Sequence, residues 1–150
     1  MTNKFTVEIS TAYSPELAAG IGLLGPQLDP LFSSDPVPEA RLRSIIDSPS
    51  HDQLIARRDN ALIVGAATMS VVMGSLFGER GQLEDFVLDA SVQGGPVAPM
   101  MWEAMSNWCA SRGLPEWYFQ TEPDKPRAVG FYNRNATLLP DSITYKGVVS

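Results

Sequence analysis

Residues 81–98 read GQLEDFVLDASVQGGPVA, and this stretch decides how the rest of the chain is interpreted. Its first part is an apolar strand that carries two adjacent carboxylates, Glu84 and Asp85. Its second part is a glycine-rich loop that leads directly into a pattern typical of a helix. Because backbone amides are free at a helix N-terminus, this strand–loop–helix unit predicts a phosphate site.

The same unit suits a long ligand with a diphosphate at one end. Five residues would offer backbone amides to the phosphates: Gln93, Gly94, Gly95, Val97 and Ala98. The backbones of Phe86 and Leu88 would pair with an extended, amide-rich arm, as an added strand does. Coenzyme A has this shape. The simpler interpretation is an ordinary strand-to-helix turn, with both apolar side chains in the core.

Composition excludes several classes of function. The 150 residues are 44% apolar and 19% charged, and the formal net charge of −6 argues against nucleic acid as a partner. One cysteine, Cys109, excludes an internal disulfide, and one histidine, His51, makes a histidine-based metal site improbable. No apolar run approaches the ~20 residues of a membrane span, and residues 1–5 lack a signal core, so we expect a cytoplasmic protein.

Patterning predicts strands and helices in a definite order. The expected strands are residues 5–9, 53–58, 61–72, 82–88, 116–121 and 142–149. The expected helices are residues 15–24, capped by Ser14, a second one starting at residues 38–39, then 95–112 and 126–134. Asp59 and Asn60 form a two-residue hairpin turn, and residues 73–81, with three glycines, are expected to be a mobile connection.

This order predicts an α/β (α+β) fold, with a mixed, mostly antiparallel sheet flanked by about four helices. The connection from Leu88 through the long helix to Trp117 is typical of a crossover between two parallel strands. We find no repeat and no domain boundary, so we expect residues 1–150 to form one domain.

Several segments, in this order, resemble the GNAT superfamily of N-acetyltransferases. Asp89 followed by Gln93–Ala98 is similar to the pyrophosphate loop of that family, R/Q-x-x-G-x-G/A. LEDFVL at 83–88 is similar to its central strand, and RRDNALIVG at 57–65 to its substrate-side hairpin. AVGFYNRNA at 128–136 is similar to a segment near its C-terminus. The likeness covers roughly residues 53–137.

The resemblance implies transfer of an acetyl group from acetyl-CoA to a primary amine by direct attack, without a metal. Glu84 would be the general base. In a pleated strand it shares a face with Phe86 and Leu88, and Asp85 shares one with Leu83 and Val87, so we expect one of the two acids to lie in a mostly apolar setting. Tyr132 would protonate or hydrogen-bond the departing thiolate, and Lys125 and Ala128 would contact the cofactor. Asp85 or a water chain remains an alternative base, and Tyr132 could instead be a structural aromatic residue.

Three departures from the family pattern keep a second function open. Pro96 removes one amide from the phosphate loop, Lys125 stands where an Asn is common, and Ala136 replaces an expected glycine. The alternatives are a catalytically weak or inactive module that binds acyl-CoA or a protein partner, and a purely structural domain. The expected acceptor is a small-molecule or peptide amine of unknown identity. A homodimer remains an option, with no nucleic acid or membrane partner.

Overall fold

The computed structural model describes residues 3–150 and divides them into two compact units. The first extends to Phe119 and the second is Gln120–Ser150. The expectation of one domain stays a prediction.

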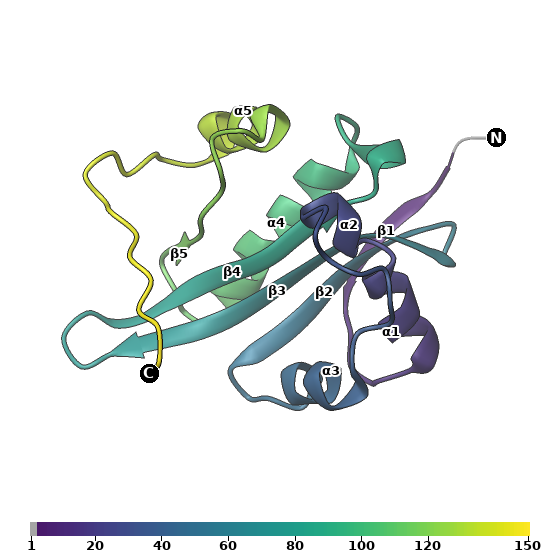
Figure 1. Cartoon of the computed structure of the whole chain (residues 1–150), viewed down its shortest axis with the longest axis horizontal. Helices are drawn as coiled ribbons and strands as arrows, with labels where there is room; N and C mark the ends of the chain where they lie inside the picture. The colour runs from purple at the N-terminus through teal and green to yellow at the C-terminus, as the bar shows by residue number, and fades with distance from the viewer. Residues whose placement is uncertain (1–2) are drawn as a thin grey trace. The chain divides into compact units, whose positions relative to one another are not determined.

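A five-stranded sheet forms the centre of the first unit (Figure 1). Its strands lie in sequence order and are β1 (Phe5–Ile9), β2 (His51–Arg58), β3 (Leu62–Gly74), β4 (Gly78–Leu88) and β5 (Trp117–Tyr118). The first four pair in antiparallel fashion, and β5 pairs with β4 in parallel through Gly81↔Trp117 and Gln82↔Tyr118. The predicted mixed, mostly antiparallel sheet and its parallel crossover are therefore confirmed.

Helices cover both faces of this sheet (Figure 1). One face carries α1 (Pro15–Gly22), the single turn α2 (Gly25–Leu28) and α3 (Glu39–Ile46), whose apolar residues pack with Ile55, Ala66 and Val87. The other face carries α4 (Val97–Ser111), which packs on a separate cluster with Leu54, Val64 and Met69. The first predicted helix, residues 15–24, ends at Gly22, and the separate turn α2 that follows it was not predicted.

Local signals fix several of these boundaries. The hydroxyl of Ser14 accepts a hydrogen bond from the amide of Leu17 at 3.0 Å and caps α1, as predicted. Asp59 and Asn60 have φ values of 52° and 57°, the left-handed pair that a tight two-residue hairpin needs. Gly113 has φ 69° just after α4, where a left-handed residue ends the helix.

The predicted mobile connection at residues 73–81 is instead part of the sheet. β3 continues to Gly74 and β4 starts at Gly78, so only residues 75–77 turn the chain. Gly78, with φ 79°, supplies the conformational freedom for this turn. Gly81 serves close packing, because a Cβ there would lie 2.8 Å from Cβ of Trp117 and 2.9 Å from Sγ of Cys109.

A β-bulge interrupts the pairing of β3 with β4. Thr68 pairs with Glu84 and Ala66 with Val87, so the single residue Ala67 faces two residues of β4. One of the two, Asp85, has φ 52°. Side chains that pair across a sheet lie on the same face, so Glu84 shares its face with Val87. The predicted alternation, which placed it with Phe86 and Leu88, was wrong.

The second unit holds one helix, α5 (Pro126–Asn135), close to its predicted range. The predicted strand at residues 142–149 was wrong, since that segment has no regular structure. Ile143 and Tyr145 are 72% and 86% exposed, so their alternation with polar residues buries no face there. Likewise, only two residues of the strand predicted at 116–121 pair with the sheet, as β5. Among residues 3–150, no helix is both long and apolar enough to span a membrane.

Candidate active site

The edge of β4 becomes free partway along the strand. β5 contacts β4 only through Gly81 and Gln82, where the amide of Gly81 also donates to the carbonyl of Glu116 at 3.0 Å. Beyond that point, no strand within residues 3–150 pairs with this edge of β4. The bulge at Asp85 and Phe86 follows directly, so β4 offers an open edge beside an irregular backbone.

Glu84 lies where the edge opens. Its side chain is exposed and accepts a hydrogen bond from Nε2 of Gln82 at 3.2 Å. Its cross-strand partner Thr68 donates to Oε1 of Gln53 instead, at 3.3 Å. Asp85 is exposed as well, so the predicted apolar setting for one of the two acids was wrong. Glu84 is thus a solvent-accessible carboxylate, oriented by a neighbouring amide.

The N-terminus of α4 lies at the other end of the predicted cofactor site. Gly94 has φ 77°, and the first helical hydrogen bond runs from the amide of Met100 to the carbonyl of Pro96 at 3.2 Å. The amides of Val97 and Ala98 precede that bond and have no partner within the helix. Pro99, which sequence analysis missed, removes a further amide from this first turn. The prolines leave fewer donors than an average helix start.

Two of the predicted phosphate-loop residues also hold the loop in place. Nε2 of Gln93 donates to the carbonyl of Leu88 at 3.0 Å, and the amide of Gly95 donates to the carbonyl of Val92 at 3.3 Å. These bonds tie the loop to the end of β4. They leave the amides of Val97 and Ala98 as the free donors of the helix start.

A polar network that sequence analysis did not single out links α2 to the same loop. Asp89 caps the short 3-10 turn Ala90–Val92 and accepts hydrogen bonds from Ser91 and, at 2.8 Å, from Nε2 of Gln27. The side-chain bond from Ser91, followed by that from Gln27, lowers the pKa of Asp89. The Gln27 carbonyl oxygen in turn accepts from the amide of Ala90. Asp89 therefore stays ionised and fixes the connection between β4 and α4.

The remaining predicted site residues belong to the second unit. Lys125 is the residue before α5, and Ala128 and Tyr132 are on that helix. The ring of Tyr132 meets that of Phe131 edge-on, with centroids 5.9 Å apart. Burial raises the pKa of Tyr132 to about 12, so its hydroxyl keeps its proton at physiological pH.

Cys109 is the one thiol of the chain, and it is buried in α4. Burial raises its pKa to about 11. Because the thiolate is the nucleophilic form, a buried thiol with this pKa is a poor acceptor for an acyl group.

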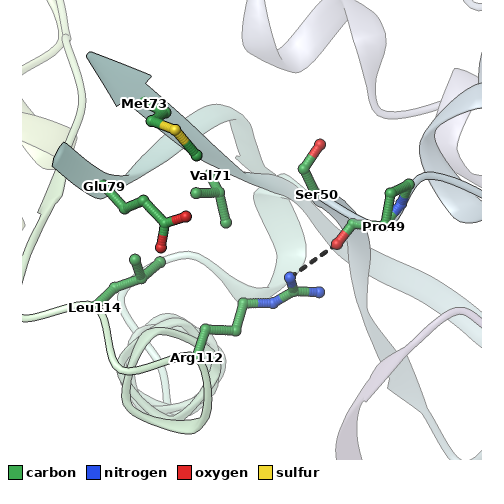
Figure 2. A pocket seen from close by; sticks show the side chains of 7 residues that line it. All are labelled: Pro49, Ser50, Val71, Met73, Glu79, Arg112 and Leu114. Carbon is green, nitrogen blue, oxygen red and sulfur yellow. Dashed lines mark hydrogen bonds between the residues drawn. The ribbon is translucent and has the colours of Figure 1, made fainter. Parts of the chain in front are cut away.

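An open cavity of about 480 Å³ lies elsewhere, beside the C-terminal end of α4 (Figure 2). Arg112 donates to the carbonyl of Pro49 at 3.0 Å and pairs with Asp52 at 2.9 Å, and Asp52 also accepts from Trp108. The residues lining the cavity are Pro49, Ser50, Val71, Met73, Glu79, Arg112 and Leu114. None is a predicted site residue, and the arginine is already paired, so this cavity is not the candidate active site.

The sequence was compared with models of known protein families, and one of them matches. Residues 23–136 match the model of the acetyltransferase (GNAT) family. This segment is more than half of the chain. The chain therefore belongs to the GNAT acetyltransferase family, which supports acetyl transfer as its general activity.

Solved structures share this fold at low sequence identity. An aminoglycoside acetyltransferase from an uncultured soil metagenomic sample, in complex with trehalose, has a TM-score of 0.78 and 15% identity, with 97% of each chain covered. Aminoglycoside N-acetyltransferase AAC(6')-Iy in complex with CoA has a TM-score of 0.79 and 18% identity, covering 98% of this chain and 97% of that one.

A third similar structure is described as a transcriptional regulator from Bacillus halodurans C-125. Its TM-score is 0.76 at 17% identity, with 95% of this chain and 100% of that one covered. No curated protein matches the chain in sequence. At these identities, the solved structures support the fold and leave the acceptor undefined.

Proposed function

We propose that the protein transfers an acetyl group from acetyl-CoA to a primary amine. The observation that carries this proposal is the position of Glu84, which is exposed on β4 where β5 has diverged and immediately before the bulge. A ligand arm paired with the free edge of β4 would bring its reactive end close to this carboxylate.

The cofactor would bind along β4 and α4. Its diphosphate would accept hydrogen bonds from the amides of Val97 and Ala98, and from that of Gly94 in the loop, whereas the amide of Gly95 is already bonded to the carbonyl of Val92. Its pantetheine arm would pair with the backbone of Phe86 on the free edge. Leu88 would contribute less than expected, because its carbonyl already accepts from Gln93. CoA is bound in the similar structure of AAC(6')-Iy, in line with this cofactor class.

The chemistry would be a direct attack on the thioester. Glu84 takes a proton from the substrate ammonium, directly or through water, and the neutral amine then attacks the thioester carbonyl. The tetrahedral intermediate loses its second N–H proton to solvent and expels the CoA thiolate, and Tyr132 donates its hydroxyl proton to that sulfur and is then reprotonated from solvent. An acyl-cysteine intermediate is disfavoured because Cys109 is buried with a raised pKa. The amine lone pair forms the new C–N bond in the attack, and the C–S bond breaks when the intermediate collapses.

The proposed role of Glu84 as general base is tested by substituting Glu84 and, as a control, its neighbour Asp85. Glu84→Gln is expected to lower kcat/KM for the amine by about 10²- to 10⁴-fold at neutral pH, the usual range for a general base. The deficit should shrink at high pH, where the amine is already deprotonated. Thiol release from acetyl-CoA, measured across pH over a panel of amines, gives both rates.

Asp85→Asn is the matched control, because Asp85 is also an exposed acid on β4. Asn tolerates the left-handed backbone that Asp85 adopts, so the variant should fold and keep its activity. If Glu84→Gln keeps wild-type kcat/KM at every pH, Glu84 is not the base. Loss of activity in Asp85→Asn alone would assign that role to Asp85.

One observation favours a second candidate, an acyl-CoA-binding module without catalysis. Pro96 and Pro99 both lack an amide in the first turn of α4, which weakens the phosphate site. Isothermal titration with acetyl-CoA, together with thiol release over the amine panel, separates the two functions. Tight binding without turnover on any amine would favour the binding module.

A further inference from the structure

Arg80 is held between two aromatic rings at the start of β4. Its guanidinium lies 4.4 Å from the ring centroid of Phe77 and 4.2 Å from that of Tyr118. Tyr118 is itself fixed, since its hydroxyl donates to Oε1 of Glu116 at 2.9 Å. Contacts with both rings restrain the planar guanidinium, and Arg80 is also a side-chain hydrogen-bond partner of Tyr118.

In the described part of the chain, Arg80 lacks the carboxylate that two of the other three ring-stacked arginines have; Arg58, which stacks on Phe5, also forms no ion pair. Arg43 also stacks on a ring, that of Tyr13, and forms an ion pair with Glu39 at 2.8 Å. Arg112 stacks on Trp108 and pairs with Asp52. Within residues 3–150, Arg80 has no carboxylate within 4.0 Å, and its buried Nε–H has no acceptor.

Arg80 lies on the same face of the sheet as Glu84. On β3, Val72 pairs with Arg80 and Thr68 pairs with Glu84. Midway between these two pairs, Ser70 pairs with Gln82. The regular register places all three side chains of β4 on one face, before the bulge. Four residues of extended strand separate the Cα atoms of Arg80 and Glu84 by about 13 Å.

We propose that Arg80 binds an anionic group of the acceptor, so that the substrate carries a primary amine at one end and a carboxylate at the other. This inference rests on the proposed function, because it takes Glu84 as the position of the amine. A planar, pre-oriented guanidinium recognises carboxylate by two parallel hydrogen bonds. The substrate class is therefore zwitterionic, such as a short peptide with a free C-terminus, rather than a polycation.

Triglycine and triglycinamide are the probes, since they differ only in the terminal charge and are about 10 Å long when extended. Each is titrated calorimetrically into the protein saturated with CoA, so that no turnover occurs. Wild type is expected to bind triglycine about tenfold or more tightly than the amide, the effect of one charge-assisted contact. Arg80→Gln should remove this preference, and Arg80→Lys should restore part of it.

Arg43→Gln is the matched control, a stacked arginine on α3 that should keep the full preference. Equal dissociation constants for the two peptides in wild type, binding of neither peptide, or a preference that survives Arg80→Gln would overturn the proposal. Thiol release with triglycine is measured in parallel. A carboxylate preference without turnover would contradict the proposed catalysis alone, and turnover without the preference would contradict the role of Arg80 alone.

Discussion

Glu84 and Asp85 are adjacent acids that differ in backbone conformation and in strand pairing. Glu84 keeps a regular pairing with Thr68, whereas Asp85 has φ 52° and lies in the bulge. Sequence analysis identified both carboxylates, but a period of two could not show which face each occupies. The reason is that Asp in a left-handed conformation carries no sequence signal as clear as glycine. Arg80 was missed for a similar reason, since its two stacking partners come from the hairpin turn and from β5.

Tyr132→Phe should bind CoA normally but react slowly. The phenyl ring keeps its contact with Phe131, so stability should change little, while loss of the hydroxyl removes the proton donor to the thiolate. We expect kcat to fall by about 10²-fold or more at nearly constant Kd for acetyl-CoA. Tyr145→Phe, at an 86% exposed tyrosine, is the control. Full activity of Tyr132→Phe would make Tyr132 a structural residue.

The raised pKa of Tyr132 adds a pH dependence. The folded value of about 12 lies above the ordinary value of 10, so folding favours the protonated phenol. That contribution to stability is complete below pH 10 and is lost as pH rises through about 12. The wild-type kcat profile should therefore show no decline from Tyr132 ionisation below about pH 11. A decline between pH 8 and 10 that is absent from Tyr132→Phe would contradict this assignment.

At the scale of elements, the sequence correctly predicted those helix and turn boundaries that depend on a few neighbouring residues. The cap at Ser14, the hairpin turn at Asp59–Asn60 and the end of α4 at Gly113 all have short-range physical causes, and the structure has each of them. Errors arose where tertiary packing decides. Gly81 indicated a flexible connection, but its missing Cβ lets Trp117 and Cys109 approach the strand. The alternation at residues 142–149 predicted a strand for which no partner forms.

Replacing Pro96 with Gly tests where the phosphates bind. The change restores an amide at the N-terminus of α4, so CoA should bind equally well or several-fold more tightly. Glycine lowers stability by about 0.5–1 kcal/mol because the unfolded chain gains freedom, so the affinity is measured directly by titration. Pro38→Gly, at the corresponding position before α3, is the control and should leave CoA binding unchanged. Binding that weakens several-fold in folded Pro96→Gly would contradict the placement.

At the scale of the whole molecule, the fold and the family are established. Of the predicted site residues, Glu84 and those of the loop before α4 belong to the first unit, and Lys125, Ala128 and Tyr132 belong to the second. Motif order along the chain revealed the family. It could not reveal the bulge, the network at Asp89 or the stacked arginine, because each depends on residues distant in sequence.

Thermal unfolding with and without acetyl-CoA tests the central claim most directly. A ligand that binds only the folded state, at a hundredfold excess over Kd, raises the free energy of unfolding by about 2.7 kcal/mol. For a chain of this length that corresponds to an increase in Tm of about 5–10 °C. We predict such an increase at millimolar acetyl-CoA. An unchanged Tm in a cooperatively folded protein would contradict the assignment of acetyl-CoA as its co-substrate.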